Sequence, residues 1–297
     1  MTDLKSSFAV SFLKASACLP LAVSRALGAF VGRCNYWLDT KMAKITHENL
    51  RLAFPDMSEA ERNQLAKRSL QETGKAMLET GAVWLKDYAW VRQRILGIEG
   101  LELLEEMVNS PRGTVLLAPH IGNWEVLGLY LTEVAEVTSL YQPPDIEALE
   151  PIIRGGREKV GAKLVPTNRK GVMALLKVLK AGGFTAILPD QVPERSGGNY
   201  APFFGINALT MTLVHNLVQR TDSQVLAGYA KRVKGGYKIV FKEVEPGIGG
   251  EDETSSLTAL NRAVESCVED IPDQYQWEYK RYKRQPKGVA KFYRFKK

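Results

Sequence analysis

The chain lacks the cysteine pattern of a metal-binding or disulfide-stabilised protein. Its 297 residues include three cysteines, Cys18, Cys34 and Cys267, so any disulfide pairing would leave one of them out. Their separations also differ from the short spacings that structural metal sites use. The sequence therefore indicates a protein of a reducing compartment that needs neither a metal nor a redox cofactor.

The chain also lacks an uninterrupted apolar run long enough to cross a membrane. Residues Phe8–Val31 are strongly apolar, but Lys14 and Arg25 interrupt the run and Pro20 breaks it. A transmembrane helix needs roughly 20 consecutive apolar residues, and no signal peptide is recognisable. A pair of interfacial helices fits better, and the alternative is an amphipathic helix packed on the protein itself. We therefore expect residues 1–40 to form an N-terminal membrane-associated segment.

Acidic residues are missing from the C-terminal end. Lys280–Lys297 holds nine lysines and arginines, and removing those nine charges from the net charge of +7 leaves −2 elsewhere. Such a patch suits an anionic membrane, a nucleic acid or an acidic protein. No nucleic-acid-reading module is recognisable, and interleaved aromatics favour contact with lipid headgroups over a merely solvated tail. These aromatics are Tyr282, Phe292, Tyr293 and Phe295.

Buried apolar runs alternate with helical patterns along residues 41–297, which indicates one α/β domain ending in the basic tail 280–297. This alternation predicts a largely parallel central sheet flanked by helices on both faces. A turn at Gly235–Gly236 predicts a hairpin between the last two strands. The expected strands are Thr114–Ala118, Val137–Tyr141, Ala162–Val165, Phe184–Leu188, Gln224–Lys231 and Tyr237–Lys242.

His120 is the histidine that the predicted fold places at a site. It alone among three histidines follows a buried strand, at the strand end where active groups gather in open α/β sheets. A neutral imidazole accepts a proton from an alcohol near pH 7, and Glu125 could hold its other ring nitrogen as in a hydrolase triad. Gly122 has no Cβ and lets substrate approach. The alternative is a strand-capping histidine followed by a solvated first-turn acid.

Five short motifs, in this order, are similar to those of a known family. They are Asn-Leu-x-x-x-Phe-Pro at 49–55, His-x-Gly-Asn-Trp-Glu at 120–125, Pro-Asp-Gln at 189–191, Pro-Phe-Phe at 202–204 and Gln-Tyr-x-Trp at 274–277. With the apolar N-terminus, they resemble the bacterial lipid A late acyltransferases of the lauroyl and myristoyl type, within the lysophospholipid-acyltransferase-like superfamily. A bare His-x4-acid pattern is weak, whereas the six-residue form is much more specific. The resemblance implies a glycerolipid-acyltransferase-like α/β fold.

The resemblance implies acyl transfer from acyl carrier protein to a hydroxyl of an anionic lipid acceptor, a lipid A precursor, in lipopolysaccharide biosynthesis. The reaction would take place on the cytoplasmic face of the inner membrane, with no cofactor, metal or nucleic acid. His120 would be the general base and Glu125 its partner. The Glu-Gly-Thr-Arg block of glycerophosphate acyltransferases is missing, which argues against glycerol 3-phosphate as acceptor. The residues expected to bind substrate are Gly122, Asn123, Arg169, Asp190, Gln191, Phe203 and Phe204.

Chemical reasons support several of these assignments. Arg169 carries a planar, permanently charged fork that suits phosphate and carboxylate groups. Asp190 would orient a donor or a sugar hydroxyl. Phe203 and Phe204, beside proline and glycine, would either line an acyl pocket or pack a loop.

The chain departs from the family pattern after Gln-Tyr-x-Trp. The family continues with a histidine and paired arginines, where this chain has Tyr279, Lys280 and Arg281. The departure concerns the acceptor and the way its phosphate is held, and it keeps two alternatives open. One is an acyltransferase for another acceptor, such as a lysophospholipid, an amino-acid lipid or a pigment lipid. The other is a membrane-binding protein without chemistry.

Overall fold

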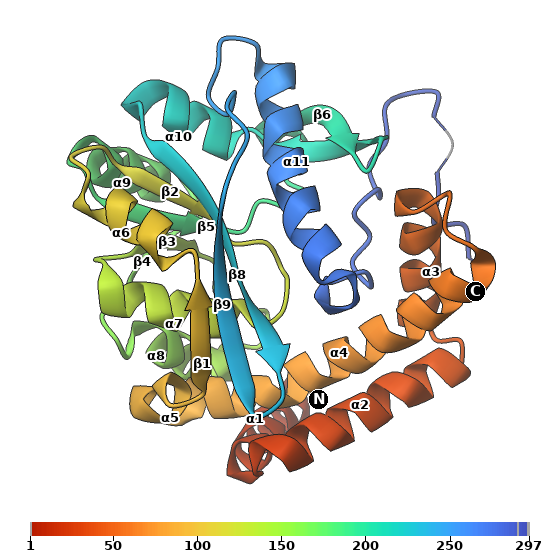
Figure 1. The fold of residues 1–297 in the computed structure, drawn as a ribbon. Coiled ribbons are helices and arrows are strands. Elements are labelled where there is room, and N and C mark those ends of the chain that lie inside the picture. Colours follow the sequence, from red (N-terminus) through yellow and green to blue (C-terminus); the bar gives the residue numbers. More distant parts are fainter. Residues whose placement is uncertain (1, 290, 296–297) are drawn as a thin grey trace.

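A five-stranded mixed sheet forms the centre of the molecule (Figure 1). The computed structural model describes residues 2–289 and 291–295, with side chains from residue 4 onward. Four of the sheet's strands lie at apolar runs where the sequence predicted strands, whereas Ile95–Glu99 was not predicted. In spatial order, the strands are β1 (Ile95–Glu99), β9 (Gly236–Glu243), β8 (Gln224–Val233), β2 (Thr114–Leu117) and β5 (Phe184–Ile187).

The sheet is mostly parallel, as predicted. Strand β2 pairs in parallel with β5 and with β8, and β1 pairs in parallel with β9. The exception is the antiparallel pair of β8 and β9. These two strands are joined by a tight turn in which Gly235 has a φ of +82°, and strands joined so directly can only be antiparallel. The predicted hairpin at Gly235–Gly236 is confirmed.

Two small sheets lie beside the central one. Strands β3 (Thr138–Tyr141) and β4 (Lys163–Pro166) form a parallel pair at two positions where the sequence predicted strands. Strands β6 (Gly198–Phe203) and β7 (Ile206–Met211) form an antiparallel hairpin that the sequence did not predict. The hairpin was missed because Pro202 lies inside β6, and proline is normally evidence against a strand.

Helices cover both faces of the central sheet, which confirms the predicted layers. Val115 and Leu117 of β2 pack into one core cluster, whereas Leu116 packs into a second cluster on the opposite face. The first cluster includes residues of α9 (Arg169–Lys180), α10 (Leu213–Thr221) and α11 (Glu253–Asp270), and the second those of α6 (Leu101–Asn109) and α7 (Trp124–Val134). Shorter or peripheral helices are α3 (Lys41–Ala53), α5 (Tyr88–Arg92), η1 (Glu147–Leu149), α8 (Glu150–Glu158), η2 (Arg195–Gly197) and η3 (Pro272–Gln274).

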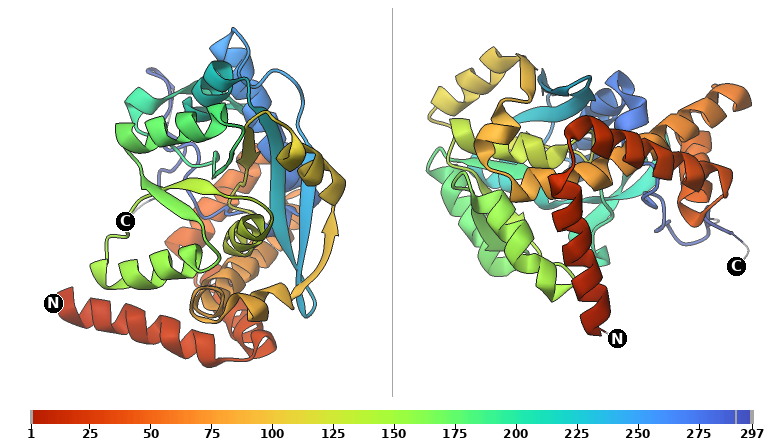
Figure 2. Two further views of the ribbon diagram at one scale, coloured as in Figure 1. Left: turned by 90° about the vertical axis from the view of Figure 1, so that its left-hand side faces the viewer. Right: turned by 90° about the horizontal axis from the view of Figure 1, so that it is seen from below.

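The N-terminal apolar segment forms two helices, α1 (Thr2–Cys18) and α2 (Leu21–Trp37), with the break at Pro20 that the sequence indicated. Helix α1 extends away from the sheet, whereas α2 runs along the long helix α4 (Glu59–Leu85) (Figure 2). Among the described residues, no helix combines the length and apolar character that crossing a bilayer requires.

Close packing joins α2 to α4. Gly28 and Gly32 of α2 face the backbone of α4 at Gly74 and Leu70, where an added Cβ would collide with main-chain atoms. Helix α4 itself begins with a capping box, in which Ser58 N donates to a Glu61 carboxylate oxygen over 2.9 Å. This long, well-capped helix connects the N-terminal pair with the α/β domain.

The start of the basic C-terminal stretch is packed into the protein. Arg281 is 2% exposed and donates to Leu209 O over 2.7 Å. Tyr282 is also buried, and the Tyr293 hydroxyl donates to Asn49 Oδ1 over 2.6 Å. This part of the stretch is therefore not the solvated tail of the alternative interpretation. Residues 290, 296 and 297 lie outside the described part of the chain.

Candidate functional site

His120 lies just beyond the carboxyl end of β2, at the position that the sequence predicted. Its partner is Asp190, which follows the neighbouring strand β5. The carboxylate makes two contacts: Oδ1 lies 2.9 Å from His120 Nδ1, and Oδ2 accepts from His120 N over 3.1 Å. The Asp190 side chain is 2% exposed, compared with 14% for His120. The parallel register of β2 and β5 thus brings a buried acid to a partly accessible imidazole.

The contact with Asp190 fixes the proton arrangement of the imidazole. A carboxylate on Nδ1 requires the proton there, which leaves Nε2 as the acceptor. Gln191 Nε2 lies 3.2 Å from His120 Nε2 and completes this arrangement as a donor. Burial disfavours the charged carboxylate, but the charge of His120 and hydrogen bonds to it outweigh burial and hold the pKa of Asp190 below its ordinary value. The site thus keeps an ionised acid behind a basic nitrogen.

The C-terminal Gln-Tyr-Gln-Trp block holds the loop that carries His120. Gly122 N donates to Gln274 O over 3.0 Å, and Gln276 N donates to His120 O over 3.2 Å. Between these bonds, Ile121 and Tyr275 form an antiparallel bridge. Gly122 has a φ of +58°, and a Cβ there would meet the Ala230 carbonyl. The sequence motif therefore has a structural function that spacing alone did not indicate.

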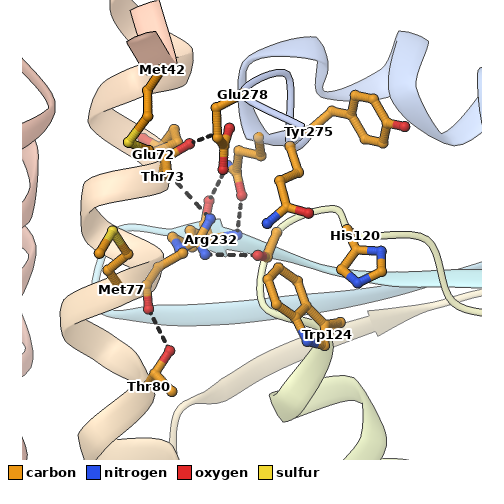
Figure 3. Close-up of a pocket in the computed structure, with 14 residues that line it drawn as sticks. Met42, Glu72, Thr73, Met77, Thr80, His120, Trp124, Arg232, Tyr275 and Glu278 are labelled. Atoms are coloured by element: carbon orange, nitrogen blue, oxygen red, sulfur yellow. Dashed lines mark hydrogen bonds and ion pairs between the residues drawn. The ribbon is translucent and has the colours of Figure 1, made fainter. Parts of the chain in front are cut away.

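A cavity of about 390 Å³ opens beside His120 (Figure 3). Helix α4 forms one wall and the Gln274–Glu278 block another. Gly122 and Trp124 line it as well, and the Trp124 ring lies 5.0 Å from the His120 ring between centroids. The α4 residues that line it are Glu72, Thr73, Ala76, Met77 and Thr80. A group bound here would reach the imidazole directly.

Glu278 is a second acid in this cavity. Thr73 Oγ1 donates to Glu278 Oε2 over 3.0 Å. Burial raises the pKa of Glu278, and the hydrogen bonds to it and the charge of His120 only partly offset that effect. Met42 and Met77 give the cavity apolar walls beside these few polar groups, a combination that is typical of ligand sites.

Glu125 does not contact His120. The structure corrects the expected pairing, because both Glu125 carboxylate oxygens accept from Arg157, at 3.0 Å to Nε and 2.5 Å to Nη2. Glu125 is the second residue of α7, and its side chain reaches α8, which carries Arg157. Burial disfavours the charge on Glu125, but Arg157 outweighs burial, and the pKa of Glu125 lies below its ordinary value.

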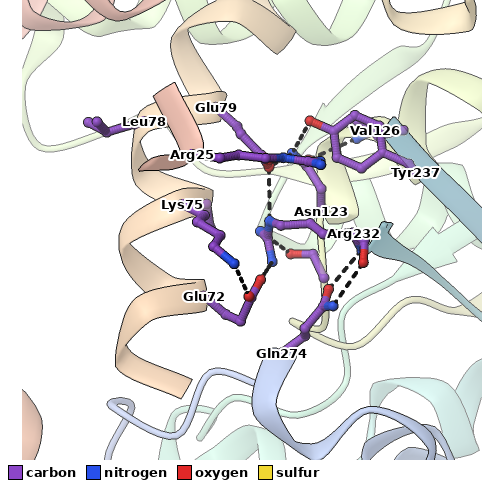
Figure 4. Close-up of polar contacts among 12 residues, drawn as sticks. Arg25, Glu72, Lys75, Leu78, Glu79, Asn123, Val126, Arg232, Tyr237 and Gln274 are labelled. Carbon is purple, nitrogen blue, oxygen red and sulfur yellow. Dashed lines mark hydrogen bonds and ion pairs between the residues drawn. The ribbon is translucent and has the colours of Figure 1, made fainter. Parts of the chain in front are cut away.

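Asn123 joins the site to a buried ion cluster (Figure 4). Its Oδ1 accepts from Val126 N over 3.2 Å and caps α7, while its Nδ2 donates to Glu79 Oε2 over 3.1 Å. Glu79 is also paired with Arg232 at 2.9 Å and with Arg25 of α2. Asn123 therefore holds the start of α7 and faces the ion cluster.

The other expected substrate-binding residues lie elsewhere. Arg169 is exposed at the start of α9. Phe203 is buried in the core, and Phe204 packs edge-on against Phe54, so the loop-packing interpretation applies to this pair. None of these three expected residues lines the cavity beside His120. In the part of the chain that the structure describes, no group of three His, Cys, Asp or Glu side chains could hold a metal ion.

Sequence reasoning missed Glu79, Arg157, Arg232 and Glu278. Each lies more than 30 positions from its partner at the site or belongs to a stretch without recognised chemistry. The one available signal was the position of Glu278, which directly follows the family-like Gln-Tyr-Gln-Trp block.

The fold and the site define an α/β protein that presents a histidine–aspartate pair to a partly apolar cavity at the carboxyl ends of its strands. This arrangement suits removal of a proton from a hydroxyl group. The bacterial lipid A biosynthesis acyltransferase family matches residues 3–284. The chain belongs to this family and is an acyltransferase.

Three relatives have names that refer to lipid A. The lipid A biosynthesis lauroyltransferase of Escherichia coli K12 is 26% identical over 281 residues, which is 93% of this chain and 90% of the relative. The palmitoleoyltransferase of that strain is 25% identical, with 93% and 90% covered. The myristoyltransferase is 22% identical, with 91% and 83% covered.

Proposed function

We propose that this protein transfers a fatty acyl group from acyl carrier protein to a hydroxyl of a lipid A precursor. His120 Nε2 takes the hydroxyl proton, and the oxygen attacks the carbonyl carbon of the donor thioester. The carbon–sulfur bond then breaks, and the carrier thiolate leaves and receives the proton from the imidazolium. Asp190 stabilises that imidazolium, a role in which a buried carboxylate on Nδ1 is effective.

The observation that carries this proposal is the His120–Asp190 pair, in which His120 lines the cavity and Asp190 is buried behind it. The contact of 2.9 Å leaves Nε2 as the basic nitrogen, and the cavity gives an acceptor a path to it. Family membership supports the acyl transfer, and the names of the relatives support lipid A as the acceptor. Glu125 acts in this proposal through Arg157, by fixing the start of α7.

The net charge and the exposed apolar side chains of the protein support two partners, the acyl carrier protein and the membrane surface. Acyl carrier proteins that serve this family are acidic, and a net charge of +7 favours their approach. Exposed apolar side chains on α1 and α2, among them Phe8 and Phe30, favour a position on the membrane surface. We place the protein on the cytoplasmic face of the inner membrane, where donor and acceptor meet.

The test is acyl transfer by the purified protein, with acyl carrier protein as donor and product mass measured by mass spectrometry. Wild-type protein should acylate the lipid A precursor. His120→Ala should be slower by roughly 10²–10⁴-fold, the range that general-base catalysis supplies, with an unchanged melting temperature.

The outcomes separate the candidates. Near-normal turnover by folded His120→Ala would contradict the mechanism. Transfer to a lysophospholipid but not to the lipid A precursor would favour the alternative acceptor. Binding to vesicles with no transfer to either lipid would favour the binding-only alternative.

A further inference from the structure

A second cavity, of about 320 Å³, lies beside α4 and next to the cavity at His120. Helix α2, helix α4 and the end of β8 line it, and Figure 4 shows four of its charged side chains, those of Arg25, Glu72, Lys75 and Arg232. Half of its eight lining residues are basic, and two are small alanines of α2 that leave room between the charges. The charged lining residues are Arg25, Glu72, Lys75, Arg232 and Lys234.

Positive charge exceeds negative charge around this cavity. Glu79 neutralises only one of the two guanidiniums that contact it, those of Arg25 and Arg232. Lys75 is paired with Glu72, and Lys234 at the rim is exposed. Four cationic side chains therefore meet two carboxylates among the described residues here, and without exposed Lys234 the partly buried groups still carry an excess of one positive charge.

An excess of partly buried positive charge is costly unless an anion balances it. The Arg232 guanidinium is 4% exposed, and its Nη1 lies 3.7 Å from Glu72 Oε2, beyond hydrogen-bonding distance. Arginine and lysine side chains arranged around a space of this size suit a phosphate group, which carries up to two negative charges and several acceptor oxygens.

Glu72 provides a second indication about the ligand. Its Oε2 is buried and accepts no hydrogen bond from the described residues. A buried carboxylate oxygen without a donor is unfavourable, and a hydroxyl group of a ligand would satisfy it. A phosphate next to a hydroxyl-bearing ring meets both requirements, which points to a sugar phosphate.

The two cavities are contiguous. Glu72 and Arg232 line both, and Arg232 Nη2 also donates over 2.7 Å to Gly122 O, two residues from His120. A ligand with its phosphate in the second cavity can therefore extend toward the imidazole. Exposed Leu27 and Phe30 on α2 adjoin the alanine-lined wall and suit the acyl chains of a lipid.

We propose that the cavity formed by Arg25, Lys75, Arg232 and Lys234 binds a sugar phosphate of the acceptor lipid and so sets which hydroxyl reaches His120. The proposal rests on the proposed function, because the reacting hydroxyl is the one presented to His120. The bond made and broken in the reaction is unchanged. The cavity supplies only orientation and preference for a phosphorylated acceptor.

The test compares Lys234→Glu with a matched control, Lys180→Glu, which makes the same charge change at an exposed end of α9. The substrates are the phosphorylated acceptor and the same lipid after phosphatase treatment, in a neutral detergent without phospholipid. Lys234→Glu should reduce the kcat/KM preference for the phosphorylated lipid roughly tenfold, mainly through KM. Lys180→Glu should keep the wild-type preference. An unchanged preference in Lys234→Glu, or an equal loss in both variants, would overturn the proposal.

A binding measurement separates this proposal from the proposed function. Glucose 1-phosphate should raise the melting temperature of wild-type protein, whereas glucose should not, and Lys234→Glu should lose the effect. This result would stand even if the protein failed to acylate lipid A. If Lys234→Glu instead weakened only binding to phosphatidylglycerol vesicles, the cavity would serve a bilayer headgroup and the acceptor proposal would be wrong.

Discussion

At the residue scale, the site depends on two side chains that are 70 positions apart in the chain. His120 follows β2 and Asp190 follows β5, and the parallel pairing of these strands places both at one edge of the sheet. Because Asp190 accepts from both the backbone N–H and the ring of His120, it fixes the orientation of the imidazole as well as its tautomer. Position and protonation are thus set by one carboxylate.

Asp190→Asn should lower kcat by roughly 10²–10⁴-fold, because an amide cannot stabilise the imidazolium and can donate to Nδ1, which would invert the tautomer. The melting temperature should change little. The comparison is Glu125→Gln, which removes the charge of a partly buried ion pair with Arg157 and should cost about 1–3 kcal/mol of folding stability. Single-turnover rates and thermal unfolding measure the two effects. If Glu125→Gln lost the chemical step at full stability while Asp190→Asn kept it, Glu125 would be the partner of His120.

The sequence predicted His120 from local information but not its partner. An apolar run, a histidine and a helical pattern are adjacent in the chain, so their arrangement follows from spacing. The side-chain direction of Glu125 depends instead on Arg157, which comes from α8, and on the burial of Glu125 itself. Long-range pairing of this kind becomes visible only once the strands are placed.

Glu278 should make folding stability depend on pH. Its pKa is raised in the folded protein, so the folded chain holds this proton more tightly than the unfolded chain, where the ordinary value is about 4.5. The resulting stabilisation is full below that ordinary pKa and is lost as pH rises through the raised pKa. Glu278→Gln removes the titration and can still accept from Thr73. We therefore expect the variant to become progressively more stable than the wild type as pH rises from 4. Denaturant titrations of both proteins at several pH values from 4 upward measure this difference. A difference in folding stability that stays constant with pH would contradict a raised pKa of Glu278.

At the element scale, α2 is a packed part of the structure as well as an apolar helix. Its glycines let the helix axis approach α4, and Arg25 reaches across to Glu79, Val233 O and Gly236 O. Helix α4 in turn lines the cavity next to His120. A shift of α2 would therefore be transmitted to the wall of the site.

Gly28→Leu tests this packing. The new side chain would meet main-chain atoms of α4, which cannot rotate away, and the overpacking should cost about 1–3 kcal/mol. Ala22→Leu is the matched control, because Ala22 lies on an exposed part of α2. Thermal unfolding of both variants in one detergent provides the measurement. Equal melting temperatures would mean that α2 is only loosely attached to α4.

The elements themselves were largely predictable. Local apolar patterns indicated the N-terminal helix pair and strands β2, β5, β8 and β9, because regular helices and buried strands depend on near neighbours. The contacts of α2 were not predicted, since an apolar helix with glycines at two positions one turn apart reads equally as membrane-facing or as packed. Only the facing Gly74 distinguishes these cases, and it lies in another helix.

At the scale of the whole molecule, exposed apolar side chains concentrate on the N-terminal helix pair. They include Phe8 at 72% exposure on α1 and Phe30 at 58% on α2. A surface of this kind is typical of a membrane or protein contact. Helix α2 lines the second cavity and α4 lines both cavities, so a membrane contact at the N-terminal helices would bring lipid close to the second cavity.

The double variant Phe8→Ser/Phe30→Ser should bind vesicles of phosphatidylethanolamine and phosphatidylglycerol more weakly. Each phenylalanine that enters the interface contributes about 1.5–3 kcal/mol, so losing even one should reduce the partition coefficient roughly tenfold or more. Met173→Ser is the control, because Met173 is also 58% exposed but lies on α9. Cosedimentation should be repeated at high salt, where screening weakens the attraction of the basic surface but leaves apolar burial intact. If the two variants bound equally at both salt concentrations, α1 and α2 would not form the membrane contact. A loss confined to low salt would assign that contact to the basic residues instead.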